Sequence, residues 1–214
     1  MNVGVILAAG NSNRYGGDLP KQFQSFKNKM IVEYSINTFF SHPEIDEVLL
    51  LVPDKYLELA KQKIKKCRVL CGGKTRQESS FIALNACSKK TKNILIHDAA
   101  RPFVDAQIIS KCLEELKNNT AVCPALPSTD TIAKVKNNNI KKILNRNILY
   151  RLQTPQAFNY KVLLECHKKL TKNVTDDISV VQEQGYIPKI IIGNKKNMKI
   201  TYQQDLKIIN YYYE

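Results

Sequence analysis

The chain has 214 residues, of which 43% are hydrophobic and 24% are charged. This composition suits one folded domain over residues 1–214 and excludes intrinsic disorder as the main state. The longest apolar runs are strand-length, far short of the roughly 20 residues that span a bilayer, so no membrane association is expected.

Strand-like and helix-like segments alternate along the first 127 residues. Short apolar runs predict strands at 4–10, 47–53, 68–73, 93–100 and 120–127. Helical periodicity and capping residues predict helices at 31–42, 54–66, 76–87 and 105–119. This alternation predicts an α/β fold of three layers, Rossmann-like, with a mostly parallel sheet and helices on both faces. In such folds the loops after the strands hold the ligands.

The alternation breaks at 129–151. Two short strands flank a run of three asparagines at 137–139, which predicts a β-hairpin arm. The arm has too few apolar residues for a core of its own, so we expect it to project and to pack against a partner surface. A strand at 186–194 and a closing helix at 202–213 follow.

The cysteines and the N-terminus both bear on the compartment. Six cysteines stand singly, without a CxxC pair or a histidine at ligand spacing, which predicts reduced thiols that lie mostly in the core. No basic stretch precedes the apolar N-terminal run, so a secretory signal is not expected. These features predict a cytoplasmic protein.

The formal net charge of +14 is compatible with a nucleic-acid partner or with small polyanionic ligands. The lysines are spread over every segment, and tyrosines gather at 211–213 rather than within a basic stripe. We therefore expect no nucleic acid as partner. Only six of the 33 basic residues are arginine. The planar guanidinium suits phosphate and is not freely replaced by lysine, so an arginine in this lysine-rich chain marks a position where geometry matters.

Two glycine-containing loops follow predicted strands. In the first, Gly10, Gly16 and Gly17 flank Arg14, and Lys21 follows, a composition that suits anion binding by backbone N–H groups and cations. It matches neither GxGxxG nor the Walker pattern, which disfavours a dinucleotide-dependent oxidoreductase. The second, at 72–79, begins with two glycines that allow close backbone approach; it is either a base-reading loop or a capped helix start.

A third loop places Asp98 at the end of a buried apolar strand. A carboxylate there needs a partner, which is either Mg²⁺ bound to phosphates or Arg101 as an ion pair. We interpret the neighbouring His97 as a structural residue rather than a general base.

Together these stretches resemble one enzyme family. LAAGNSNRYGGDLPKQF resembles the signature loop of the sugar- and polyol-phosphate nucleotidyltransferases. HDAARPF, TPQAF, VTDD and NMKIT, in this order, resemble the 2-C-methyl-D-erythritol 4-phosphate cytidylyltransferases. The resemblance covers residues 3 to 207 and implies a nucleotidyltransferase fold and a reaction of CTP with a polyol phosphate that releases pyrophosphate.

The resemblance also implies roles at matching positions. The implied catalytic residues are Arg14, Lys21 and Lys199. The implied nucleotide-binding residues are Ala8, Ala9, Gly10, Gly73, Arg76 and Ser79. The implied substrate-binding residues are Arg101, Thr131, Arg146, Thr154 and Thr175, and Asp98 is the implied Mg²⁺ ligand. In this family the arm crosses to a second subunit, which implies a homodimer with exchanged arms.

The chain departs from the family pattern at a few positions. Ser12 stands where a second glycine is common, Tyr15 where methionine is, and Lys74-Thr75 where a small or acidic residue followed by Glu is frequent. Ribitol 5-phosphate cytidylyltransferases share most of the pattern and usually carry a different pair at Ala99-Ala100, so a pentitol phosphate is the alternative substrate.

Overall fold

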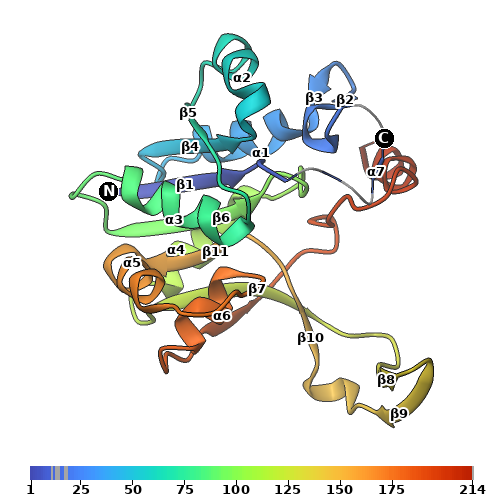
Figure 1. Cartoon of the computed structure of the whole chain (residues 1–214). Helices are drawn as coiled ribbons and strands as arrows, with labels where there is room; N and C mark the ends of the chain where they lie inside the picture. Colours follow the sequence, from blue (N-terminus) through green and yellow to red (C-terminus); the bar gives the residue numbers. More distant parts are fainter. Residues whose placement is uncertain (11, 13–14, 17–18, 214) are drawn as a thin grey trace.

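The computed structural model describes residues 1–10, 12, 15–16 and 19–213. Within these residues, eight strands form one central mixed sheet (Figure 1). In chain order they are β1 (Asn2–Leu7), β4 (Glu47–Val52), β5 (Arg68–Cys71), β6 (Asn93–Asp98), β7 (Ala121–Pro127), β10 (Tyr150–Leu152), β11 (Gln156–Asn159) and β12 (Lys189–Ile192). In space the order is β10-β7-β11-β6-β1-β4-β5, with β12 also paired to β7. The predicted α/β sheet is confirmed.

Helices cover both faces of this sheet and complete three layers. α1 (Ile31–Phe40), α2 (Leu57–Lys63) and α4 (Ala106–Glu115) contribute to one buried cluster, and α3 (Arg76–Ala86), α5 (Tyr160–Lys169) and α6 (Asp177–Gln182) to the other. Alternate strand residues face opposite layers: Ile6 and Leu50 belong to the first cluster, Val5 and Leu51 to the second. The uninterrupted apolar runs in the sequence therefore reflect burial on both faces.

Polar side chains cap the starts of α3, α4 and α6, whereas no side chain of the described residues caps the start of α2. The side chain of Thr75 accepts from the Glu78 N–H at the start of α3, and Asp105 accepts from the Ile108 N–H at the start of α4. Asp176 accepts from the Ser179 N–H at the start of α6. Each cap satisfies one N–H that has no partner within its helix.

The sheet contains antiparallel strands in a segment where the sequence predicts no element. The strands β1, β4, β5 and β6 are mutually parallel, whereas β11 lies antiparallel between β6 and β7. β11 is followed by α5 and α6, so the stretch 153–185 supplies part of the second helical layer.

A third apolar cluster joins the C-terminal helix to the first loop. α7 (Asp205–Tyr213) contributes Ile209, which packs with Tyr15, Phe26, Ile31 and Ile200. The small hairpin of β2 (Ser25–Phe26) and β3 (Lys29–Met30), preceded by the short η1 (Lys21–Phe23), lies beside α7 on the same side of the molecule (Figure 1). A second short 3-10 turn, η2 (Asp54–Tyr56), precedes α2, so the helix predicted at 54–66 is shorter than expected.

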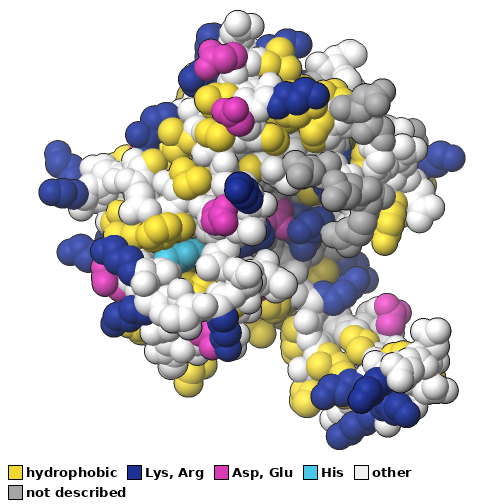
Figure 2. Space-filling view, in the orientation of Figure 1, with side chains coloured by type: hydrophobic (Ala, Val, Ile, Leu, Met, Phe, Trp, Pro, Cys, Tyr) yellow, Lys and Arg dark blue, Asp and Glu magenta, His cyan; other side chains and the backbone are white. Residues whose placement is uncertain are grey.

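The predicted arm is present as a hairpin that projects away from the sheet (Figure 1). β8 (Ala133–Lys136) pairs antiparallel with β9 (Asn139–Ile143), and η3 (Arg146–Ile148) leads back to β10. Asn137 and Asn138 both have positive φ, as a two-residue type I′ turn requires. Val135, Ile140 and Ile143 are exposed, and Figure 2 shows apolar and basic side chains together on the arm. The arm buries little of its own apolar surface.

All six cysteines are free thiols. Cys112, Cys123 and Cys166 are buried and the other three are half-buried, so half of them are core residues in the strict sense. Across the described ranges of the chain, no helix combines the length and apolar character that crossing a membrane requires.

Candidate active site

A cavity of about 380 Å³ opens at the carboxyl ends of β1, β5 and β6. Its walls are the loop after β1, the loop after β5, residues 98–100 after β6, and Lys199 from the C-terminal segment. Leu7 and Asp98 are paired at the ends of adjacent parallel strands, which brings the first and third loops together. The prediction that ligands bind at this edge of the sheet is supported by the position of this cavity.

Gln22 holds the first loop in place. Its Nε2 donates to the carbonyl oxygens of Ala8 at 2.6 Å and Gly10 at 3.0 Å, and its Oε1 accepts from the Ser12 hydroxyl at 3.0 Å. The Ser12 hydroxyl also accepts from the backbone N–H of Lys21 at 3.2 Å. Gln22 is buried, and nothing in the sequence pattern distinguished it from a surface glutamine.

Ser12 has a φ of 57°, the left-handed region that favours glycine. Its two hydrogen bonds offset the strain that a side chain introduces there, so the structure accommodates serine at this position. Tyr15, the neighbouring departure, is buried in the third apolar cluster against the C-terminal helix.

The second loop fits closely against the first. A Cβ atom at Gly72 would lie 2.4 Å from Ala9 Cβ, and one at Gly73 would lie 2.3 Å from Glu78 Cβ. The absence of a Cβ atom at these two positions therefore allows close packing within the protein, and base reading by this loop stays a prediction. Ser79 Oγ accepts from the Gly73 N–H at 3.0 Å and donates to the Thr75 carbonyl at 2.9 Å, which fixes the loop as a cavity wall.

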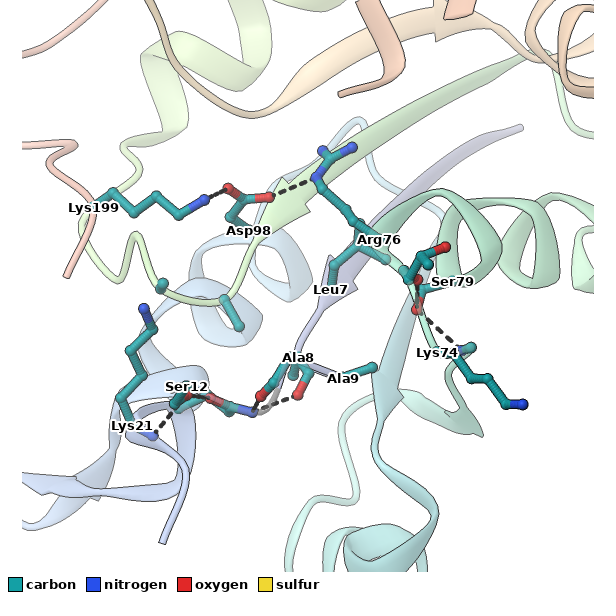
Figure 3. A pocket seen from close by; sticks show the side chains of 16 residues that line it. Leu7, Ala8, Ala9, Ser12, Lys21, Lys74, Arg76, Ser79, Asp98 and Lys199 are labelled. Carbon is teal, nitrogen blue, oxygen red and sulfur yellow. Dashed lines mark hydrogen bonds and ion pairs between the residues drawn. The ribbon is translucent and has the colours of Figure 1, made fainter. Parts of the chain in front are cut away.

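Two lysines from opposite ends of the chain meet at the cavity. Lys21 Nζ donates to the Ile200 carbonyl at 2.6 Å, and Lys199 Nζ lies 2.6 Å from Asp98 Oδ2 (Figure 3). The Ile200 N–H donates to the Ala100 carbonyl at 2.8 Å. The segment that carries Lys199 is thus held between the first and third loops.

Asp98 is surrounded by positive charge. Its Oδ1 lies 3.2 Å from Arg76 Nε, and Arg76 Nη1 in turn lies 2.5 Å from Asp177 Oδ2. Burial raises the pKa of Asp98, but Arg76 and then Lys199 outweigh it and hold that pKa well below its usual range. The carboxylate is therefore ionised at neutral pH, as a metal ligand or an ion-pair partner must be.

His97 and Thr154 form a buried support beneath Asp98. Thr154 Oγ1 accepts from the Asp98 N–H at 3.1 Å and lies 3.0 Å from His97 Nδ1, while His97 Nε2 lies 2.9 Å from the Arg101 carbonyl oxygen. Because that carbonyl can only accept, Nε2 carries the proton and Nδ1 accepts from Thr154. Burial lowers the pKa of His97 to about 4. These bonds agree with the structural interpretation of His97.

Arg101 binds backbone rather than facing the cavity. Its Nη1 donates to the Asn197 carbonyl at 2.8 Å and its Nη2 to the Leu152 carbonyl at 3.3 Å. Its Nε is buried and has no hydrogen-bond partner within the described part of the chain. In this conformation Arg101 ties the turn before Lys199 to the third loop.

Comparisons with known proteins agree with this geometry. The model of the family "IspD: 2-C-methyl-D-erythritol 4-phosphate cytidylyltransferase" matches residues 2–214. The chain belongs to this family. It is 40% identical over 220 residues to the 2-C-methyl-D-erythritol 4-phosphate cytidylyltransferase of Thermosipho africanus, covering 98% of this chain and 96% of that protein.

Relatives of two sizes occur in this family. The bifunctional enzyme IspD/IspF of Pelagibacter ubique is 38% identical over 208 residues, which cover 96% of this chain and 56% of that protein. Among solved structures, the 4-diphosphocytidyl-2C-methyl-D-erythritol synthase of Anaerococcus prevotii superposes with a TM-score of 0.87 at 28% identity, covering 99% of this chain and 97% of that chain. The bifunctional IspDF of Campylobacter jejuni superposes with a TM-score of 0.85 at 26% identity, covering 96% and 53% respectively.

The remaining residues implied by the family pattern do not line the cavity of this chain. Thr131 and Arg146 are exposed on the arm, where Arg146 Nη1 donates to the Thr129 carbonyl at 3.2 Å. Thr175 is exposed immediately before α6, and Thr154 is buried below Asp98. Arg14 lies outside the described residues. The structure therefore brings together Ala8, Ala9, Gly10, Lys21, Gly73, Arg76, Ser79, Asp98 and Lys199.

Proposed function

We propose that this chain joins CTP and 2-C-methyl-D-erythritol 4-phosphate to give 4-diphosphocytidyl-2-C-methyl-D-erythritol and pyrophosphate. Family membership over residues 2–214 supports the activity as a cytidylyltransferase and does not favour a ribitol 5-phosphate enzyme. The observation that carries the proposal is the cavity at the strand ends, where Arg76 and Lys199 pair with the Asp98 carboxylate and Lys21 lines the same cavity.

The reaction needs charge neutralisation rather than a general base. A phosphate oxygen of the polyol substrate forms a new bond to the α-phosphorus of CTP, and the bond from that phosphorus to the β-phosphate oxygen breaks. The attacking oxygen is already anionic at neutral pH, so no proton has to be removed. This chemistry agrees with a cavity whose nearest histidine, His97, is neutral and committed to Thr154 and Arg101.

The candidate site residues divide into two proposed groups. Lys21 and Lys199, with Arg14, would hold the triphosphate and stabilise the charge that develops at the α-phosphorus. Ala8, Ala9 and Gly10, with Gly73, Arg76 and Ser79 across the cavity, would bind the nucleotide. The nucleotide-binding group lies on facing walls formed by the first and second loops, and Lys21 and Lys199 line the same cavity, which supports both proposed roles.

A divalent cation is general among enzymes of this class, and we propose Asp98 as the residue that would hold Mg²⁺. Magnesium is typically bound by one or two carboxylates together with substrate phosphates and water. One ionised carboxylate at the strand end, beside a cavity lined by Lys21, Arg76 and Lys199, fits that donor set. The ion would supply neutralisation of phosphate charge when bound.

We expect the Asp98→Asn variant to lose nearly all turnover at saturating Mg²⁺, as wild-type enzyme does in EDTA. The reason is that an amide cannot replace an ionised carboxylate as a hard-cation ligand. Turnover and melting temperature are measured on the same preparations. An Asp98→Asn protein that melts early but retains metal-dependent turnover would show that Asp98 serves only as an ion-pair partner of Arg76 and Lys199.

We further propose a homodimer with exchanged arms. The exposed Val135, Ile140 and Ile143 need a covering surface, and a second copy of the arm offers a matching one. Arg146 and Thr131 would then contribute to the substrate site of the neighbouring subunit, beside Arg101, Thr154 and Thr175 of that subunit.

The six cysteines are free thiols, which supports the reducing cytoplasm as the proposed compartment of the enzyme.

The test of the function is pyrophosphate release from CTP with each candidate polyol phosphate. We expect release with 2-C-methyl-D-erythritol 4-phosphate and a kcat/KM at least ~10²-fold lower with ribitol 5-phosphate, since misplaced hydroxyl groups leave site polar groups unpaired. A preference for ribitol 5-phosphate, or the absence of release with both, would contradict the proposal. ATP, GTP and UTP in place of CTP serve as controls for base selectivity.

A further inference from the structure

Asp177, the first residue of α6, lies directly behind the cavity wall. Its side chain is 1% exposed and does not line the cavity. Oδ2 lies 2.5 Å from Arg76 Nη1 and accepts from the Ser80 hydroxyl at 3.2 Å, while Oδ1 lies 3.1 Å from His167 Nε2. Three side chains from α3 and α5 thus converge on one buried carboxylate.

The position of Asp177 is fixed by residues outside α6. Gln156 Oε1, from β11, accepts from the backbone N–H groups of Asp177 at 3.1 Å and Ile178 at 3.3 Å. Gln156 Nε2 donates to Asp176 Oδ2 at 3.1 Å. Because β11 is paired with β6, the strand that carries Asp98, the start of α6 is tied to the same part of the sheet as the cavity.

Arg76 connects this buried group to the cavity. Its Nε faces Asp98 Oδ1 at 3.2 Å, as Figure 3 shows, and its Nη1 faces Asp177. Nη2 is buried and has no hydrogen-bond partner among the described residues. The donors of a guanidinium lie in one rigid plane, so a bond at Nη1 sets the direction of Nε. If Nη1 lost its partner, Arg76 could rotate and present two donors to Asp98.

The charges agree with a fixed arrangement. Burial raises the pKa of Asp177, but the Arg76 charge and then the His167 hydrogen bond hold it below its ordinary value. A buried carboxylate between two donors of this kind is stable only while both partners stay in place. The Asp177 carboxylate is therefore ionised at neutral pH, opposite the buried end of Arg76.

We propose that Asp177 is a positioning residue for cytidylyl transfer, one that acts through Arg76 on the nucleotide and on Asp98. This inference rests on the proposed function of the cavity. Asp177 restrains the Arg76 guanidinium so that it contributes one donor, Nε, to Asp98 and leaves the other oxygen of that carboxylate to Lys199. Loss of the restraint would displace Arg76 from the nucleotide and would tighten its pairing with Asp98.

The test is a double-mutant cycle between Asp177→Asn and Arg76→Ala, read out by CTP binding in calorimetry and by kcat and KM for CTP. We expect each single variant to weaken CTP binding about tenfold or more, as when one partner of a buried charge pair is removed. The double variant should bind CTP within about twofold of Arg76→Ala alone, because Asp177 has no effect once Arg76 is gone. A purely structural role of Asp177 predicts effects that multiply.

Serine variants make the test independent of how well Asp177→Asn folds. The Ser80→Ala variant, in α3, loses one hydrogen bond to Asp177. The control variant Ser110→Ala, in α4, loses the 2.9 Å hydrogen bond between Ser110 Oγ and His42 Nε2. Ser110→Ala should leave CTP binding unchanged, whereas Ser80→Ala should weaken it a few-fold at a comparable loss of melting temperature.

The outcomes separate the inference from the proposed function. If the wild-type enzyme turns over CTP and the Asp177→Asn and Ser80→Ala variants bind CTP as tightly as wild type, the inference is overturned and the proposed function stands. Multiplying effects in the cycle would do the same. Wild-type enzyme that neither binds nor turns over CTP would overturn both.

Discussion

Lys21→Ala is expected to lower turnover by ~10²–10³-fold, the range seen when a donor that stabilises developing charge is removed. Lys21 lies on the cavity wall, and its Nζ reaches the segment that carries Lys199 by donating to the Ile200 carbonyl. Its loss removes a positive charge from the proposed triphosphate site. The measurement is kcat for pyrophosphate release at saturating CTP, with melting temperature recorded alongside.

A matched control is Lys90→Ala. Lys90 is exposed in the turn between α3 and β6, at the amino ends of the strands and so at the opposite edge of the sheet from the cavity. Its removal lowers the net charge by the same amount and should leave turnover unchanged. Equal effects of the two variants would mean that only overall charge matters, and near-normal turnover of folded Lys21→Ala protein would refute the role of Lys21.

The features that the sequence predicted correctly are those governed by local pattern and burial. Apolar runs ending in glycine or Asp, such as those that precede Gly10 and Asp98, identified β1 and β6 and the edge of the sheet at which the cavity lies. The capped helix start at Thr75, one of the two interpretations of the second loop, was also readable, because this cap acts on a backbone N–H only three residues away. Such interactions depend little on the rest of the fold.

The features that the sequence did not reveal depend on partners far along the chain. Gln22, Gln156 and Asp177 lie in stretches that resemble the family, but the sequence assigned them no role, because their importance comes from what the fold places beside them. β11 escaped prediction because four residues carry too little pattern to mark an antiparallel strand. The family pattern located Thr154 and Arg101. It did not show that Thr154 bonds to His97 and to the Asp98 N–H, or that Arg101 bonds to a backbone carbonyl.

The arm gives the second large effect, through complementation between inactive subunits. Lys21→Ala and Arg146→Ala proteins, each inactive alone, are expected to regain activity when mixed under conditions of subunit exchange. Arg146 is exposed on the arm, where its side chain donates to the Thr129 carbonyl. Its planar fork suits a phosphate held by two parallel hydrogen bonds. If it serves the neighbouring subunit, each heterodimer contains one site with both residues intact and one site with neither.

The magnitude follows from counting sites. Independent sites predict roughly half of wild-type activity per heterodimer, and about a quarter for an equal mixture in which half of the dimers are mixed. Subunit exchange is verified by native mass spectrometry with one subunit isotopically labelled. The control is a mixture of Lys21→Ala and Lys199→Ala proteins, because both residues line one cavity within a chain. That control pair leaves every site defective and should stay inactive. Confirmed exchange without recovery for Lys21→Ala and Arg146→Ala would assign Arg146 to its own subunit, and the exposed Val135, Ile140 and Ile143 would then need a different covering surface.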